Sequence, residues 1–491
     1  MVQGTASSAG KSTLVAGLCR LFARRGVRVA PFKAQNMSNN AAVCPGGGEI
    51  GRAQFAQADA AGVEPTVDMN PILLKPQGGA SQVVVRGQVR GVQTAREYFG
   101  PKRGDLWPVV ADSLDRLRAQ FDLVIAEGAG SPAEINLRAR DIVNMRVALH
   151  AEAEVLLVGD IDRGGAFAAL LGTWEWLSPD ERALVRGFVL NKFRGDAGLL
   201  SPAPELLEQR TGVPVLGVVP YLDDLSLPEE DAASLAQRSG TDARVEIAVV
   251  RLPHLANFDE FGPLAAEPGV HVRYVSQAAE LRAPDLVIVP GTKATIPDLL
   301  WVAEHGLADR IQWLASHGTP VLGICGGYQM LGEVVRDPDG FESNQRDAPG
   351  LRLLPIATEL VAEKRLVRTH GRFLNHGLGV WSRLAGLPVE GYEIHMGRSH
   401  SLADHPPFVQ LEAGAEGSVG TDTPVVGTHV HGVFEQSMPR QALVQALAAT
   451  RGFTWQAPGT QVGNPFDVIA DALEKNVRLG SLIAAGGRND G

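Results

Sequence analysis

The sequence has little of what marks secreted, membrane-spanning or nucleic-acid-binding proteins. Only three of its 491 residues are cysteine, too few for a disulfide framework, so we expect a reducing, cytoplasmic environment. No apolar run approaches the roughly 18 residues of a membrane span, and the first residues lack the pattern of a secretory signal. The net charge of −10 argues against general nucleic-acid binding. We therefore expect no membrane and no nucleic-acid partner, and an anionic ligand must meet local positive charge.

What the sequence does have is two series of short apolar runs separated by helical stretches, in a chain long enough for two to four domains. This alternation is typical of parallel α/β sheets. The runs of the first series are 27–32, 123–126, 155–158, 187–190 and 215–220, and those of the second are 245–250, 286–289, 321–324 and 425–428.

We predict an α/β fold of two doubly wound, mostly parallel-sheet domains. The first spans 1–222 and the second spans 244–442, joined by an acidic linker over 223–243 that is poor in large apolar residues. Residues 443–491 are predicted to form a helical segment that packs on the second domain. Apolar residues at helical spacing place the terminal helix at 468–484.

A glycine- and serine-rich loop opens the first domain, in Gly4-Thr-Ala-Ser-Ser-Ala-Gly-Lys-Ser-Thr13. Small residues let backbone N–H groups converge on a polyphosphate at the start of the helix that follows. Lys11 is expected to reach the β- and γ-phosphates of ATP, and the Ser12 hydroxyl to bind Mg²⁺. The predicted ATP-binding residues of this loop are Thr5, Ser7, Gly10, Lys11, Ser12 and Thr13. Only three residues precede the loop, so we expect its strand to have lost residues at the start.

Polar residues follow three further predicted strands of this domain. Glu127 and Asp160 come directly after two of them, and Asn191 follows a third. Ligands of doubly wound sheets gather at the carboxyl ends of strands. The two carboxylates are therefore candidate Mg²⁺ ligands, and the Asn191 amide is a candidate hydrogen-bond partner of the nucleobase. Helix caps or turns are the alternative for each acidic residue.

Cys325 lies where an apolar strand runs into a turn of small residues and then a helix. Such a nucleophile elbow places a thiol at a helix N-terminus, which favours its thiolate. The N–H groups of Gly326 and of Gly291, at another strand end, are candidate donors to an oxyanion. The alternative is a buried, unreactive cysteine, which is the fate we assign to Cys19 and Cys44.

A histidine should serve as the base for this thiol. His429 and His431 end a later strand and share one of its faces. His431 is nearer the turn, and we predict that it is the catalytic base and that His429 is structural.

With both sites in view, the chain resembles the cobyric acid synthase family over nearly its full length. The first loop is similar to that of dethiobiotin-synthetase-type phosphate-loop proteins. The Gly-x-Cys-x-Gly-x-Gln at 323–329 is similar to that of class I glutamine amidotransferases, which have a flavodoxin-like fold. The longer segments that carry the family resemblance are KAQNMSNN at 33–40, MNPILLKP at 69–76 and DIDRGG at 160–165.

The resemblance implies a glutamine- and ATP-dependent ligase of cobalamin synthesis. Ammonia from glutamine, with Gln329 at the glutamine site, would amidate the b, d, e and g carboxylates of adenosylcobyrinic acid a,c-diamide after their activation as acyl phosphates. The implied cofactors are ATP and Mg²⁺. Candidate residues for the polycarboxylated corrinoid are Lys33, Gln35, Asn36, Lys75, Arg138 and Arg163.

One feature departs from class I amidotransferases, in which Pro-Glu follows the catalytic histidine. Here Gly432 and Val433 follow His431, and Glu435 and Glu393 are candidates to orient the imidazole. Two alternative functions remain at this point: the related cobyrinic acid a,c-diamide synthase, and a non-catalytic ATP switch with a relic amidotransferase domain. The sequence also leaves open whether the chain forms a homo-oligomer.

Overall fold

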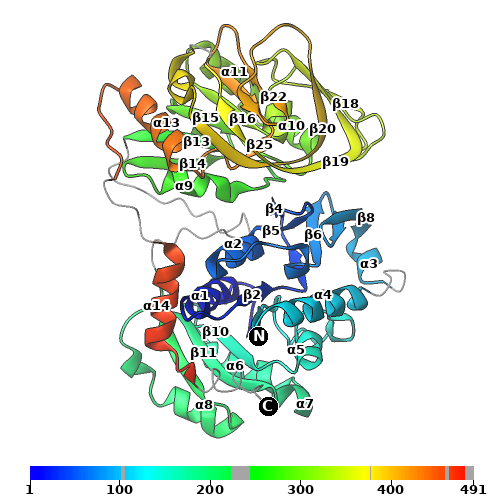
Figure 1. Cartoon of the computed structure of the whole chain (residues 1–491), viewed down its shortest axis with the longest axis vertical. Helices are drawn as coiled ribbons and strands as arrows, with labels where there is room; N and C mark the ends of the chain where they lie inside the picture. The colour runs from blue at the N-terminus through cyan, green and yellow to red at the C-terminus, as the bar shows by residue number, and fades with distance from the viewer. Residues whose placement is uncertain (101–105, 223–243, 376–377, 459–463, 481–491) are drawn as a thin grey trace.

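A computed structural model of the chain describes residues 1–100, 106–222, 244–375, 378–458 and 464–480. It has an N-terminal half and a C-terminal half, drawn at the bottom and top of Figure 1. The predicted linker, 223–243, lies outside the described residues.

The N-terminal half is built on parallel strands that begin with the phosphate loop's own strand. Four of them pair in the order β1-β10-β11-β12, with bounds Val2–Gly4, Val155–Asp160, Val185–Phe193 and Val215–Pro220. Two more, β2 (Val29–Phe32) and β9 (Leu123–Ala126), pair in parallel, and a bridge from Val2 to Glu127 joins them to β1. Their residues are apolar and largely buried, as expected for a sheet covered on both faces. The helices are α1 (Lys11–Arg24), α2 (Arg52–Ala61), α4 (Trp107–Gln120), α5 (Met145–Ala151), α6 (Ala166–Glu175), α7 (Pro179–Arg182) and α8 (Ala203–Thr211).

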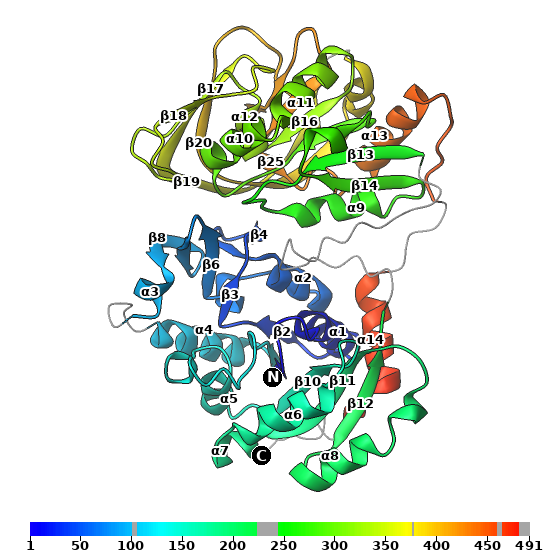
Figure 2. The same cartoon turned by 180° about the vertical axis from the view of Figure 1, so that it is seen from behind.

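Small strands between β2 and α4 face the other half of the molecule (Figure 2). Their bounds, with the short helix α3, are β3 (Gln35–Met37), β4 (Ala41–Val43), β5 (Glu49–Gly51), β6 (Ile72–Gln77), β7 (Ala80–Val85), β8 (Gln88–Thr94) and α3 (Ala95–Tyr98). Val43 and Leu73 of this group pack with Tyr392 and Ile394 of the C-terminal half in one buried apolar cluster. The two halves therefore share a buried apolar contact.

The C-terminal half contains a six-stranded sheet, in the order β14-β13-β15-β16-β24-β23, that is parallel except for β23. The bounds in that order are Val270–Val275, Val245–Val250, Leu286–Val289, Val321–Ile324, Val425–Thr428 and Ser418–Val419. Its helices are α9 (Gly262–Ala265), α10 (Thr295–Glu304), α11 (Leu307–Ser316), α12 (Gly326–Met330) and α13 (Ser437–Thr450). Together the two sheets confirm the predicted mostly parallel α/β architecture.

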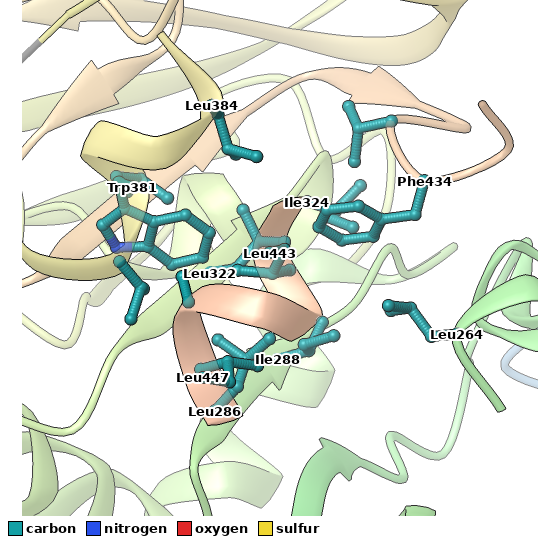
Figure 3. Packing of buried hydrophobic residues seen from close by; sticks show 14 of the residues in the cluster. Leu264, Leu286, Ile288, Leu322, Ile324, Trp381, Leu384, Phe434, Leu443 and Leu447 are labelled. Atoms are coloured by element: carbon teal, nitrogen blue, oxygen red, sulfur yellow. The ribbon is translucent and has the colours of Figure 1, made fainter. Parts of the chain in front are cut away.

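A second, mainly antiparallel sheet crosses the C-terminal half. Its long strands are β19 (Ile356–Phe373) and β20 (Pro388–Ser401), and its short ones are β17 (Val334–Arg336), β18 (Asp347–Pro349), β21 (Val409–Leu411), β22 (Gly414–Glu416) and β25 (Val430–His431). Between the two sheets lies a core in which Trp381 packs near Leu322 of β16 and Leu443 of α13 (Figure 3). Burying each such side chain stabilises the fold by about 1.5–3 kcal/mol relative to leaving it exposed to water.

The terminal helix corrects one prediction. The segment 443–491 was expected to pack on the second domain, and α13 does so, but α14 (Pro465–Asn476) lies on the N-terminal half beside α1 (Figure 1). The physical reason is a matched surface. Ile469 and Leu473 fit where Gly17 of α1 has no side chain, since a Cβ there would lie 2.4 Å from Ile469 Cγ2.

Charges reinforce this pairing of α14 with α1. Arg20 binds Asp467 at 2.7 Å, Arg24 binds Asp471 at 2.5 Å and Arg25 binds Glu474 at 2.7 Å. After the helix, Val477 forms a bridge with Gly217 of β12. The helix begins before residue 468 and ends well short of the predicted 484, and residues 481–491 lie outside the described part of the chain.

Candidate active sites

The predicted phosphate loop connects β1 to α1, and its backbone carbonyls contact the side chain of Lys11. Gly10 takes a left-handed conformation, with φ of 92°, immediately before α1 begins at Lys11. The Lys11 ammonium donates to the carbonyls of Ala6 at 2.8 Å, Ser7 at 3.1 Å and Gly130 at 3.2 Å. The loop thus holds a cation at the N-terminus of a 14-residue helix, the arrangement that attracts a phosphate chain.

Glu127, at the end of β9, is fully buried beside this loop. Its carboxylate accepts hydrogen bonds from Ser12 Oγ at 2.8 Å, Lys33 Nζ at 2.8 Å and Gln57 Nε2 at 2.7 Å. Burial alone would raise the pKa of Glu127, but Lys33 and these hydrogen bonds outweigh it and hold the pKa below its usual value. The carboxylate is therefore an anion fixed next to the Ser12 hydroxyl.

Ser12 and Glu127 together fit Mg²⁺, because both offer the hard oxygen ligands this ion prefers. Within the described residues, no three His, Cys, Asp or Glu side chains gather as a metal site. A Mg²⁺ ion would thus have one or two protein ligands and take the rest from phosphate and water. Asp160, the other predicted ligand, lies on a different side of the loop, where it binds Lys192 at 3.0 Å while Lys192 donates to Ser8.

Asn191 also lies against the loop. Its Nδ2 donates to the carbonyl of Ala9 at 2.9 Å, and a Cβ on Gly10 would meet that nitrogen at 2.1 Å. The amide nitrogen therefore supports the loop with one of its two N–H groups, and the predicted hydrogen bond to a nucleobase would use Oδ1 or the second N–H.

A cavity of about 640 Å³ opens beside Ser7 and Lys11 and is called the large cavity below. Four of the residues predicted to bind the corrinoid line it, namely Lys33, Gln35, Asn36 and Arg138. The C-terminal half contributes to the same wall through Pro253, Leu255 and Phe258. The large cavity is thus formed by both halves.

Two of the predicted corrinoid-binding residues lie elsewhere. Arg163 is exposed on the surface and faces Asp160 at 3.8 Å. Lys75 is buried in the cavity around Cys325, because its ammonium pairs at 2.9 Å with Glu49, a buried carboxylate at the contact between the halves. The structure therefore gives neither residue a place in the large cavity.

The C-terminal half carries the predicted elbow at Cys325. Strand β16 ends at Ile324, Cys325 takes φ 52° and ψ −111°, and α12 begins at the next residue. Such a strained conformation costs about 1–3 kcal/mol and is typical of active sites. Glycine is required two residues on, because a Cβ on Gly327 would lie 1.9 Å from the Val289 carbonyl oxygen. Cys19 and Cys44, predicted to be structural, are buried as expected.

His431 is buried in the same place and is held by Glu260. Glu260 Oε1 lies 2.9 Å from His431 Nδ1, while the N–H of Gly432 donates to Oε2 at 2.9 Å. Burial alone would lower the pKa of His431, but Glu260 and the Cys325 sulfur outweigh it and raise the pKa to about 10. The imidazole is thus held as a cation beside the Cys325 sulfur.

Neither carboxylate proposed from the sequence orients this histidine. Glu393 binds Arg365 at 2.8 Å and His395 at 3.2 Å, and Glu435 pairs with Arg52 of the N-terminal half. Glu260 lies 171 residues before His431, on a single 3₁₀ turn (Phe258–Phe261). No motif around Glu260 indicates this role in the sequence. The only signal was its position shortly after the predicted strand at 245–250.

A cavity of about 30 Å³ surrounds this cysteine and is called the small cavity below. All the residues predicted for glutamine line it, namely Gly291, Gly326, Gln329, Cys325 and His431. Gly291 must lack a side chain, since a Cβ there would lie 2.8 Å from His431 Cε1.

The segment 253–260 separates the two cavities. Leu255 and Phe258 line the large one, whereas Ala256 and Asn257 line the small one. Asn257 accepts a hydrogen bond from the backbone N–H of Ala41 at 2.9 Å, and its Nδ2 lies 3.3 Å from His431 Nε2. One short segment therefore contacts both sites and the other half of the molecule.

No helix within the described ranges is long and apolar enough to cross a membrane.

Comparison with known proteins covers both halves. Residues 1–235 match the family described as the CobQ/CobB/MinD/ParA nucleotide binding domain, and residues 246–439 match the CobB/CobQ-like glutamine amidotransferase domain. Cobyric acid synthase of Desulfitobacterium hafniense is 48% identical, over 100% of this chain and 98% of that protein. The enzyme of Desulforudis audaxviator is 51% identical over 98% of each chain. That of Pelotomaculum thermopropionicum is 50% identical over 92% of this chain and 88% of its own.

Proposed function

This chain belongs to the cobyric acid synthase family, and on that premise we propose that its two cavities perform the two halves of a glutamine-dependent amidation. The small cavity would release ammonia from glutamine, and the large cavity would install it on corrinoid carboxylates activated by ATP. The observation that carries this proposal is the buried group of Cys325, His431 and Glu260 one segment away from the phosphate-loop cavity.

In the small cavity, the Cys325 thiolate attacks the carboxamide carbon of glutamine. The N–H groups of Gly326 and Gly291, two residues that line this cavity, would stabilise the oxyanion that forms. His431 gives its proton to the departing ammonia, and Glu260 keeps the ring oriented and charged. Water then cleaves the thioester and frees glutamate. Glu260 acts through His431 and is a positioning residue.

In the large cavity, a carboxylate of the corrinoid takes the γ-phosphoryl group of ATP and becomes an acyl phosphate, from which ammonia displaces phosphate. Lys11 would stabilise the charge of the transferring group. Mg²⁺, held by Ser12 and Glu127, would neutralise the phosphates when bound. Because residues of the segment 253–260 line both cavities, ammonia would have only a short distance to travel from one to the other.

We assign the b, d, e and g carboxylates of adenosylcobyrinic acid a,c-diamide as the acceptors. The relatives that match over most of the chain carry the cobyric acid synthase name, which favours this substrate over the fully acidic precursor used by cobyrinic acid a,c-diamide synthase. A cytoplasmic location and the oligomeric state remain predictions.

A product-mass experiment tests the proposal. The protein is incubated with the a,c-diamide, ATP, Mg²⁺ and glutamine labelled in its amide nitrogen, and the corrinoid products are counted by mass. We expect up to four labelled amides per corrinoid. Amides added only to the fully acidic precursor would assign the related enzyme instead, and an unchanged corrinoid with both acceptors would overturn the ligase.

A further inference from the structure

The small cavity contains charged side chains for which the amidation chemistry gives no role. They are Lys75, Lys293, Lys364 and Glu342. Two of these lysines share one partner, Glu49: Lys75 lies 2.9 Å from Oε2, and Lys364 pairs with Oε1. A single carboxylate thus accounts for both of these ammonium groups.

Lys293 is different. It lies between β15 and α10, is 8% exposed and lines the small cavity. Its ammonium has no hydrogen bond or ion pair to any residue that the structure describes. Burying an ammonium group without a partner is costly. Burial and the nearby Lys75 lower the pKa of Lys293, whereas an anion bound in the cavity would raise it.

Glu342 supplies the opposite charge at the same cavity. Its carboxylate accepts a hydrogen bond from the backbone N–H of Thr295 at 2.6 Å, which fixes it at the start of α10. A carboxylate offers about four lone-pair positions, so it can accept further donors. Burial raises the pKa of Glu342 even though Lys293 opposes the shift, and a ligand ammonium would stabilise its charged form.

Lys293 and Glu342 line one cavity without forming an ion pair with each other in the structure. A separated cation and anion are complementary to the zwitterionic end of an amino acid. The other end of glutamine, its carboxamide, is placed at Cys325, Gly291 and Gly326. The cavity of about 30 Å³ has room for one or two waters, so glutamine must displace lining side chains, and flexible lysine chains can move.

We propose that Lys293 binds the α-carboxylate of glutamine and Glu342 its α-ammonium, so that this pair makes the small cavity specific for the free amino acid. The inference rests on the proposed glutaminase function of that cavity. The proposal predicts that each charged group of glutamine is bound by one residue. Substituting one of the two residues should therefore weaken recognition of one charged group and leave recognition of the other intact.

The test uses Lys293→Met, Glu342→Gln and two glutamine analogues, in the full chain with the corrinoid and ATP. The analogue 4-aminobutanamide lacks the α-carboxylate, and glutaramate lacks the α-ammonium. Loss of one charge-assisted contact should raise the KM for glutamine about 10- to 100-fold in each variant. Lys293→Met should also lose discrimination against 4-aminobutanamide only, and Glu342→Gln against glutaramate only.

Three controls separate recognition from folding and from the proposed function. Amidation with ammonium should stay within about twofold of wild type in both variants, and Lys475→Met, on the surface of α14, should change nothing. Lys293→Met should not lower the Tm, because it removes a buried charge without a partner. In Glu342→Gln, the new side chain keeps an oxygen that can accept the hydrogen bond from the backbone N–H of Thr295.

An unchanged KM for glutamine, or an equal loss with ammonium, would overturn the assignment. So would loss of both discriminations in one variant. Failure of the proposed function is distinguishable, because it would show in the wild-type protein as glutamine that is not hydrolysed.

Discussion

The two cavities lie at equivalent places in their parallel sheets and differ in size. Each lies where parallel strands end and a helix begins, at Gly10–Lys11 in one half and at Cys325–Gly326 in the other. The large cavity holds about 640 Å³, whereas the small one holds about 30 Å³ and buries its thiol and imidazole. The difference follows the chemistry that we propose. A nucleotide and a corrinoid need room, while ammonia must be released away from water.

The largest difference between glutamine-dependent and ammonium-dependent amidation is expected from Cys325→Ala. Without the thiol, glutamine-dependent amidation should fall on the order of 10⁶-fold, as when a nucleophile is removed from a catalytic triad. Amidation with ammonium should be unchanged, because the large cavity is intact. Corrinoid products are measured with each nitrogen source. Full activity with glutamine would contradict the role of the thiol.

Lys11→Ala should impair the large cavity instead of the small one. Loss of the loop's ammonium should lower amidation about 10³-fold with glutamine and with ammonium alike, since it removes charge stabilisation from phosphoryl transfer. ATP-dependent product formation is the measurement, and Lys475→Ala is a lysine control far from the loop. ATP-dependent turnover at the wild-type rate would rule out the phosphate loop.

Glu260→Gln should give a smaller loss, about 10²-fold, confined to glutamine-dependent activity. The pKa of His431 is raised to about 10, so the imidazolium is present below that pH and is lost as pH rises through it. Removing the Glu260 charge lowers this pKa. The alkaline limb of the glutaminase pH profile should therefore move to lower pH, while Glu435→Gln should leave the limb in place. An unmoved limb in Glu260→Gln would contradict the positioning role.

The smallest effect is expected on stability, at the contact of α1 with α14. Gly17→Ala should destabilise the protein by about 1–2 kcal/mol, because Ile469 and Leu473 must move away from the new methyl group. Gly172→Ala in α6 is the matched control. It meets no atom within 4 Å, so it should stabilise the protein by up to about 1 kcal/mol through helix propensity. Urea unfolding measures both, and equal effects would argue against a tight contact.

The sequence predicted those parts of the molecule whose cause is local. Strands 123–126, 245–250 and 321–324 have the predicted bounds, since continuous apolar runs identify buried parallel strands. Strand β19 was missed, because charged residues interrupt its apolar pattern. Glycine and serine spacing likewise predicted the phosphate loop, and an apolar run that ends at a cysteine before small residues predicted the elbow.

Partners that are distant along the chain could not be predicted in the same way. Glu260 meets His431 only through the fold, and the helical pattern of α14 shows that one face is buried without showing against what. Lys75 was predicted from its charge to bind the corrinoid. In the structure it pairs instead with Glu49, a buried carboxylate at the contact between the halves.

The site of α14 has a consequence for how the protein is made. Ribosomes deliver the N-terminal end first, and domains generally fold in the order in which they emerge. Yet the surface of α1 around Gly17 is covered by residues 465–476, which leave the ribosome only after the C-terminal half has been synthesised. An apolar stripe on α1 of the nascent chain therefore stays uncovered until the C-terminal half and α14 have also been synthesised.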